Sequence, residues 1–89
     1  MIDSALIRNY IANECDSVKE LLLQKNTDYG NSFAEPLRIF SNSDPREQLC
    51  NRIDDKLKRI QNRSQKVIDE DTVLDLIGYL ILLRVIEKI

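Results

Sequence analysis

Residues 73–86 form an almost unbroken apolar stretch, and a chain with such a stretch has few ways to fold. Apolar side chains cover much of the circumference of the helix that this pattern predicts: Val73, Leu74, Ile77, Leu80, Ile81 and Leu83. A second stripe, at three- and four-residue spacing, follows the opposite side of the same helix: Asp71, Asp75, Tyr79, Leu82 and Ile86. A helix with apolar residues on two sides must be covered on both sides.

The rest of the chain offers little to cover this helix, since two further long helices and one short helix barely suffice. The pattern therefore predicts self-association, as a homodimer or a homotetramer, because exposed apolar area on this scale otherwise promotes aggregation. Asp75, Gly78 and Tyr79 interrupt the stretch, which is also too short to cross a bilayer comfortably. We expect a buried helix and no membrane partner.

The composition is typical of one small all-α domain spanning residues 1–89. The 89 residues are 43% hydrophobic and 31% charged, with two glycines and two prolines, so helix breakers are few. The net charge of −2, with both signs mixed along the chain, argues against a nucleic acid polymer as a partner.

Cysteine and histidine usage argues against several kinds of site. The chain has no histidine, and Cys15 and Cys50 belong to no ligand motif, which argues against zinc and against histidine-assisted nucleophilic catalysis. No signal segment follows Met1, so both cysteines are expected to be reduced thiols in a cytoplasmic protein.

The spacing of apolar residues predicts a small bundle of three long helices and one short helix. The first long helix is expected to begin at Asp3 or Ser4 and to end near Lys25. Its apolar stripe consists of Ile7, Ile11, Cys15, Val18 and Leu22. Turn-forming residues follow, and Ser32 and Glu35 then have the spacing of a capping box. The short helix that this box predicts would bring three apolar residues onto the core: Leu37, Ile39 and Phe40.

The second long helix has the clearest predicted start. Asp44 is the capping residue, Pro45 takes the first helical position and Glu47 takes the third. The helix is expected to end between Asn62 and Ser64, and its predicted buried stripe consists of Leu49, Ile53, Leu57 and Ile60. The third long helix is expected to begin between residues 69 and 72 and to run almost to residue 89.

Four charged residues share one face of the second helix, beside its apolar stripe: Arg52, Asp55, Lys56 and Arg59. Charges in this position can line a cleft between helices, where two arginines and a lysine suit a phosphate group. The alternative is a solvated face on which Asp55 and Arg59 form an ordinary ion pair within the helix.

Two further groups of residues are candidates for the same site. Asp75, with Asp71 and Tyr79, lies beside apolar surface, where a carboxylate needs a cation, a metal or several donors; the alternative is that these acids stabilise the start of the helix. Lys25 and Tyr29 lie in the predicted turn, where a tyrosine beside a glycine can stack on a base; the alternative is a turn with Tyr29 against the core.

These motifs follow one another in a familiar order: Lys25-x-x-Asp28-Tyr29-Gly30-Asn31-Ser32, Arg52-x-x-Asp55-Lys56-x-x-Arg59 and Asp71-Thr72-x-x-Asp75-Leu76-x-x-Tyr79. Together they resemble the phage and bacterial nucleotide-modification-associated domains, which are similar to MazG-like all-α nucleoside triphosphate pyrophosphohydrolases. The resemblance implies a helical oligomer with a nucleotide pocket between helices and chains. In the catalytic members, acidic residues on two helices hold magnesium at the phosphates.

The sequence departs from the pattern of the catalytic members at the metal-binding positions. Where they carry a Glu-Glu-x-x-Glu run, this chain has Asp54-Asp55-Lys56-Leu57-Lys58, and Thr72 replaces the glutamate of the later Glu-x-x-Asp. Magnesium needs several hard oxygen ligands, whereas lysines contact phosphate directly.

Three hypotheses follow. The first is a non-catalytic nucleotide-binding protein without a cofactor, a phage sponge that sequesters a nucleotide or cyclic-nucleotide second messenger used in host defence. Its expected ligand-binding residues are Lys25, Asp28, Tyr29, Arg52, Asp55, Lys56, Arg59, Asp75 and Tyr79. The second is a Mg²⁺-dependent (d)NTP pyrophosphohydrolase whose metal ligands would be Asp55, Asp71 and Asp75. The third is a helical oligomer whose third helix binds another protein.

Overall fold

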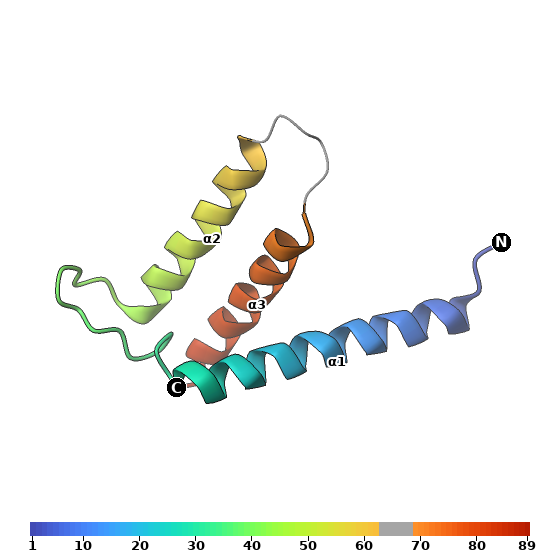
Figure 1. Cartoon of the computed structure of the whole chain (residues 1–89), viewed down its shortest axis with the longest axis horizontal. Coiled ribbons are helices and arrows are strands. Elements are labelled where there is room, and N and C mark those ends of the chain that lie inside the picture. Colours follow the sequence, from blue (N-terminus) through green and yellow to red (C-terminus); the bar gives the residue numbers. More distant parts are fainter. Residues whose placement is uncertain (63–68) are drawn as a thin grey trace. The chain divides into compact units, whose positions relative to one another are not determined.

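The computed structural model describes residues 1–62 and 69–89, and the regular structure of these residues is entirely helical. The three helices are α1 (Ser4–Tyr29), α2 (Pro45–Gln61) and α3 (Glu70–Ile86) (Figure 1). The all-α class expected from the sequence is confirmed. The chain comprises two compact units, Met1–Gly30 and Asn31–Ile89, and each is described by itself.

Helix α1 begins where the sequence predicts and ends one turn later than expected. The Asp3 carboxylate caps it by accepting a hydrogen bond of 2.9 Å from the Ala5 amide. The turn predicted for residues 25–31 is confirmed at Gly30 and Asn31, but the prediction is wrong for residues 25–29, where polar side chains form hydrogen bonds along the helix. The Thr27 hydroxyl donates to the Leu23 carbonyl at 3.1 Å, for example. The helix ends at Tyr29 because Gly30, with φ 64° and ψ −147°, takes a backbone conformation that essentially only glycine adopts.

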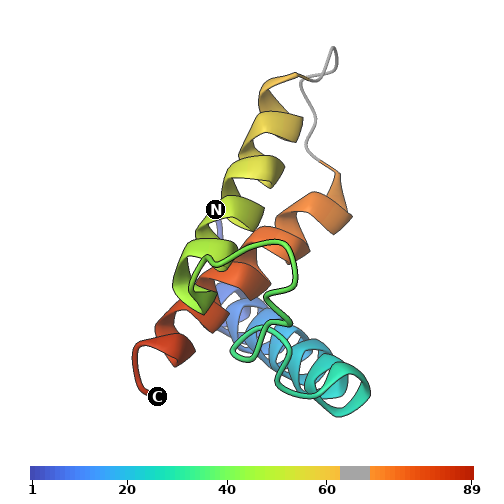
Figure 2. The ribbon, with the colours of Figure 1, turned by 90° about the vertical axis from the view of Figure 1, so that its left-hand side faces the viewer.

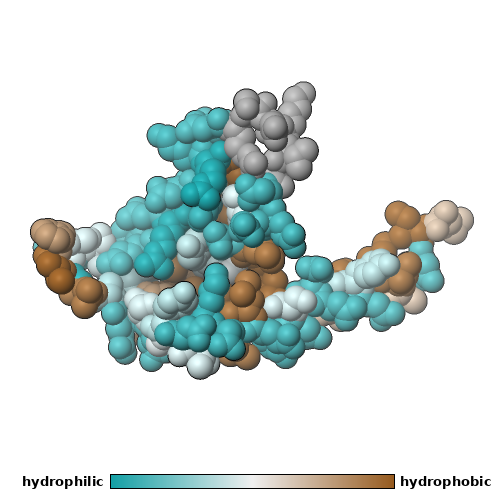
Figure 3. Space-filling view, viewed as in Figure 1, coloured by the Kyte–Doolittle hydropathy of each residue, from teal (hydrophilic) through white to brown (hydrophobic). Residues whose placement is uncertain are grey.

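The short helix expected after Ser32 is not formed. The amides of Ala34 and Glu35 both donate to the Asn31 carbonyl at 2.9 Å, which closes a single turn. Pro36 has no amide hydrogen and disfavours a helical conformation at the residue before it, so the turn does not propagate. The three apolar residues that this helix was to bury are exposed: Leu37, Ile39 and Phe40. The loop that contains them lies at the left in Figure 1, and the space-filling view shows hydrophobic surface, in brown, at that position (Figure 3).

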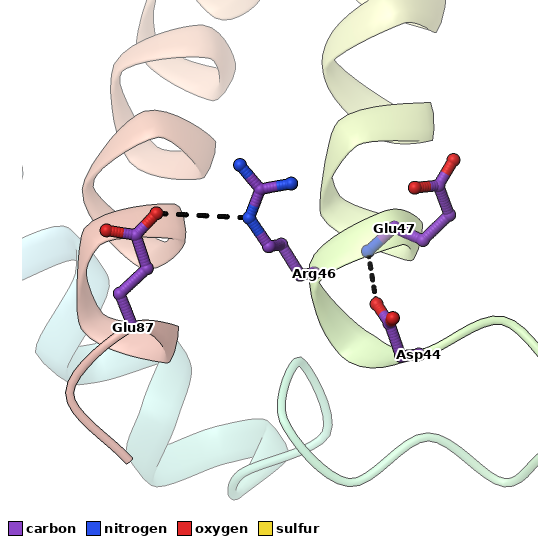
Figure 4. A network of polar contacts seen from close by, with 4 residues as sticks. All are labelled: Asp44, Arg46, Glu47 and Glu87. Carbon is purple, nitrogen blue, oxygen red and sulfur yellow. Dashed lines mark hydrogen bonds and ion pairs between the residues drawn. The ribbon is translucent and has the colours of Figure 1, made fainter.

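Helix α2 begins as its sequence predicts. Asp44 has an extended backbone, and its carboxylate accepts a hydrogen bond of 2.7 Å from the Glu47 amide, with Pro45 opening the helix (Figure 4). The helix ends at Gln61 with Asn62 as its C-cap, while Ser64, the other expected end, lies outside the described residues.

Helix α3 has the same kind of start. The Asp69 carboxylate accepts a hydrogen bond of 2.8 Å from the Thr72 amide and caps the helix. The expected start between residues 69 and 72 is confirmed. No helix within the described residues combines the length and the apolar character that crossing a membrane requires.

Helices α2 and α3 lie side by side as an antiparallel pair, as both views of the ribbon show (Figures 1 and 2). Two ion pairs join these helices. Arg46 at the start of α2 lies 3.9 Å from Glu87 just beyond the end of α3 (Figure 4). Farther along, the Lys56 ammonium lies 3.0 Å from the Asp75 carboxylate.

The contact between α2 and α3 differs from the predicted one by a rotation of each helix. On α2, Leu49 is buried and Ile53 and Ile60 are half-buried, as expected. The prediction for Leu57 is wrong: its side chain is 51% exposed, and Lys56 takes the half-buried position instead. On α3, the half-buried positions include residues of the predicted second stripe: Asp75, Tyr79, Leu82 and Ile86. Of the other predicted stripe, Leu74 and Leu83 are half-buried, whereas four residues are exposed in the single chain: Val73, Ile77, Leu80 and Ile81. That a second copy covers them stays a prediction.

Candidate functional site

A pocket with a volume of about 240 Å³ opens on one flank of the α2–α3 pair. Its lining residues are Arg52, Asp55, Lys56, Arg59 and Tyr79. Four of them come from α2, where the helical repeat places positions i, i+3, i+4 and i+7 on one flank. Tyr79 comes from α3, which the antiparallel register brings alongside. The structure therefore brings together five of the residues that the sequence singled out.

Lys56 and Asp75 form the ion pair at the centre of this arrangement. The ammonium nitrogen and a carboxylate oxygen lie 3.0 Å apart, and only 16% and 29% of the two side chains are exposed. Each charge is thereby compensated in surroundings that would otherwise penalise it. The alternative role at the helix start is confirmed for Asp71, which lies in the first turn of α3, but it is wrong for Asp75, which lies beyond that turn, and the capping residue is Asp69.

Arg52 and Arg59 are the remaining cations of the pocket. Both side chains are exposed, and neither forms an ion pair with another residue among the described ones. The ordinary pair between Asp55 and Arg59 is likewise not formed among these residues. Because Lys56 is already paired with Asp75, the charges that remain are the two guanidinium groups and the Asp55 carboxylate, which leaves one net positive charge in the site.

Thr72 stands where the resemblance places a glutamate of the catalytic members, and it was not expected to be buried. It lies one turn before Asp75 on α3, is 1% exposed, and its hydroxyl has no hydrogen-bond partner among the described residues. An unpartnered buried hydroxyl is rare in folded proteins. The motif resemblance identifies the position, but it does not predict the burial, because threonine near a helix start is common and its burial depends on tertiary packing.

Lys25, Asp28 and Tyr29 lie in the last turn and a half of α1, not in a loop. Asp28 accepts a hydrogen bond of 3.0 Å from the Gln24 side chain, and Tyr29 is exposed. They belong to the unit Met1–Gly30, whereas the pocket belongs to the unit Asn31–Ile89. The membership of these three residues in the ligand site stays a prediction.

The acids that the hydrolase alternative needs are Asp55, Asp71 and Asp75. Asp55 lines the pocket, Asp75 faces Lys56 and Asp71 is exposed. Across residues 1–62 and 69–89, no three acidic or cysteine side chains are grouped closely enough to hold a metal ion. Magnesium binding stays a prediction of that alternative.

The chain matches no protein-family model, no curated protein and no solved structure. The residues of the pocket and their chemistry are therefore the basis for inferring a function.

Proposed function

We propose that this protein binds a nucleotide in the α2–α3 pocket and releases it chemically unchanged. The observation that carries the proposal is the lining of the pocket, in which two arginines that form no ion pair among the described residues lie with Tyr79 and Asp55 around a small open space. A guanidinium group donates two parallel hydrogen bonds to a phosphate, and a tyrosine ring stacks on a base. Phosphate recognition and base stacking are the two contacts that a nucleotide requires.

The ion pair between Lys56 and Asp75 supports binding over hydrolysis. A carboxylate that holds a magnesium ion must present its oxygens to the metal together with several other hard ligands. Here the Asp75 carboxylate lies 3.0 Å from an ammonium group, which competes with a cation for the same oxygens. The likeness to nucleotide-modification-associated domains supports the same ligand class.

The biological role that we infer is sequestration of a nucleotide second messenger in the cytoplasm of an infected bacterium. A protein that binds such a messenger without turnover lowers its free concentration in proportion to the number of binding sites. Self-association, which the apolar character of α3 supports, would give one site per chain in a homodimer or homotetramer.

Binding to a panel of nucleotides and cyclic nucleotides, measured by isothermal titration calorimetry, tests the proposal. Arg52→Ala or Arg59→Ala is expected to weaken binding about 10- to 100-fold, since a charge-assisted hydrogen bond contributes ~1.5–3 kcal/mol. Lys58→Ala is the matched control, because Lys58 is an exposed cation on α2 outside the pocket lining. Equal losses in all three variants, or no binding by the wild-type protein, would contradict the proposal.

Recovery of the ligand after binding separates the proposal from the hydrolase alternative. We expect the nucleotide to be recovered intact, with or without Mg²⁺. Magnesium-dependent release of pyrophosphate that disappears in Asp75→Ala would establish the hydrolase instead. If no nucleotide binds and Leu82→Asp abolishes a cellular effect that Arg59→Ala leaves unchanged, the protein-binding hypothesis is favoured.

A further inference from the structure

The side of α3 that faces away from the ion pair carries apolar residues exposed to solvent. Ile77 follows Asp75 by two residues, which is about 200° around the helix, so it lies nearly opposite the carboxylate that contacts α2. We call the following residues the outer face of α3, with their exposed fractions: Val73 (40%), Ile77 (38%), Leu80 (51%) and Ile81 (39%). Four large apolar side chains on one exposed helix face mark an interaction surface.

Two opposite charges border this outer face at equal distances from its centre. Glu70 lies seven residues before Ile77 and Arg84 lies seven residues after it. Seven residues are two helical turns, so all three residues share one side of α3, with each charge about 10 Å from Ile77. Both charged side chains are exposed, and neither forms an ion pair with any described residue.

We propose that two copies of this chain pair through the outer face of α3, antiparallel, about a two-fold axis near Ile77. A two-fold axis there places Ile77 against Ile77 of the second copy and brings the two apolar faces together. It also places Glu70 of each copy beside Arg84 of the other. The face is therefore complementary to itself in both apolar character and charge.

The charge pattern is complementary to a second copy in the antiparallel direction only. A parallel pair would place the two Glu70 side chains together and the two Arg84 side chains together, which is unfavourable at both ends. The apolar face supplies on the order of 300–400 Å² per copy, less than the ~800 Å² per partner of a standard interface. The dimer is accordingly expected to dissociate in the micromolar range.

The pairing leaves the nucleotide pocket accessible, because Lys56 and Asp75 lie on the other side of α3. The dimer therefore has two independent pockets, neither of which is built from both copies. Failure of nucleotide binding and failure of dimerisation are consequently separate results.

Sedimentation velocity of the full chain between about 1 and 300 µM gives the first test. The wild-type protein is expected to shift from monomer to dimer over this range, and Ile77→Lys is expected to remain monomeric. Circular dichroism of Ile77→Lys checks that the helices are retained, and Leu80→Gln provides a milder second variant. A wild-type protein that stays monomeric throughout, or Ile77→Lys and Leu80→Gln proteins that dimerise as well as wild type, would overturn the proposal.

Charge exchange tests the antiparallel direction. Arg84→Glu and Glu70→Arg each replace two attractive contacts by two repulsive ones, so each variant is expected to dimerise roughly 10- to 50-fold more weakly than wild type. An equimolar mixture of the two variants restores both contacts, and native mass spectrometry should then show a heterodimer in excess of either homodimer. Lys58→Glu, which changes the net charge of α2 as Arg84→Glu changes that of α3, is the matched control.

Two results would overturn the antiparallel pairing. One is that Arg84→Glu and Glu70→Arg dimerise no more weakly than Lys58→Glu. The other is that their mixture gives no excess of the heterodimer. In 1 M salt, where the screening length falls to ~3 Å, the differences between these variants should shrink.

Discussion

Lys56 is a charged residue that occupies a position at the helix contact where an apolar residue is usual. Its stem packs against α3 while its ammonium group meets the Asp75 carboxylate at 3.0 Å, which leaves 16% of the side chain exposed. Removing one partner of such a pair leaves the other charge without compensation, whereas removing both avoids that penalty. The pair therefore favours one register of α2 against α3. Its net contribution to the free energy of unfolding is smaller than the loss caused by removing either partner alone.

Single substitutions in this pair are expected to destabilise the protein more than the double substitution does. Lys56→Met or Asp75→Asn should lower the free energy of unfolding by about 1–3 kcal/mol, a value between those of exposed and buried pairs. Lys56→Met combined with Asp75→Asn should recover part of that loss. Urea denaturation followed by circular dichroism measures these changes.

The exposed pair of Asp16 and Lys19 on α1 provides the control for this measurement. Its two atoms lie 3.9 Å apart and two thirds of each side chain is exposed. Lys19→Met should therefore change the free energy of unfolding by less than ~0.5 kcal/mol. Equal effects at Lys19 and Lys56 would contradict the structural role of the central pair.

Helices α2 and α3 begin in the same way, with an aspartate whose carboxylate accepts a hydrogen bond from the amide three residues later. We expect Asp44→Ala and Asp69→Ala each to cost about 1 kcal/mol, because an amide at the helix start then loses its acceptor. Asp44→Asn and Asp69→Asn keep a side-chain oxygen that accepts the hydrogen bond, and each should cost only a few tenths of a kcal/mol. Thermal unfolding monitored by circular dichroism measures the difference, and Asp54→Ala, at an exposed position within α2, is the control.

These helix starts were predictable because each depends on residues three positions apart in the sequence. The end of α1 was not, because Asn26, Thr27 and Asp28 are equally able to form a turn or to bond along a helix. The short helix expected after Ser32 shows that a local signal for a helix start is not sufficient for a helix to form. The capping spacing of Ser32 and Glu35 was present, but Pro36 prevents a second turn.

At the scale of the whole molecule, the predictable part of the site is the part that one helix supplies. The four charged residues of α2 share a flank whatever α2 packs against, so the helical repeat was enough to group them. The pairing of Lys56 with Asp75 and the exposure of Leu57 depend on how two helices are rotated against each other. Helix α3 carries apolar residues on more than one side, so its sequence alone fits more than one rotation, and on α2 Leu57 and Lys56 lie at opposite edges of a single stripe, where a small rotation exchanges them.

The pocket and the outer face of α3 lie on opposite sides of that helix, so binding and pairing should be energetically independent. Saturating ligand at 100 times its Kd should add about 2.7 kcal/mol to stability, and this gain should disappear in Arg52→Ala but persist in Ile77→Lys. Conversely, the rise of the thermal midpoint with protein concentration should disappear in Ile77→Lys but persist in Arg52→Ala. In the double variant the two losses should add to within ~0.5 kcal/mol, because the sites share no partners. Differential scanning calorimetry at two protein concentrations, with and without ligand, measures the stability gained from the ligand and the rise of the thermal midpoint with concentration in each variant. A loss in the double variant well below the sum would show instead that the second copy contributes to the nucleotide site.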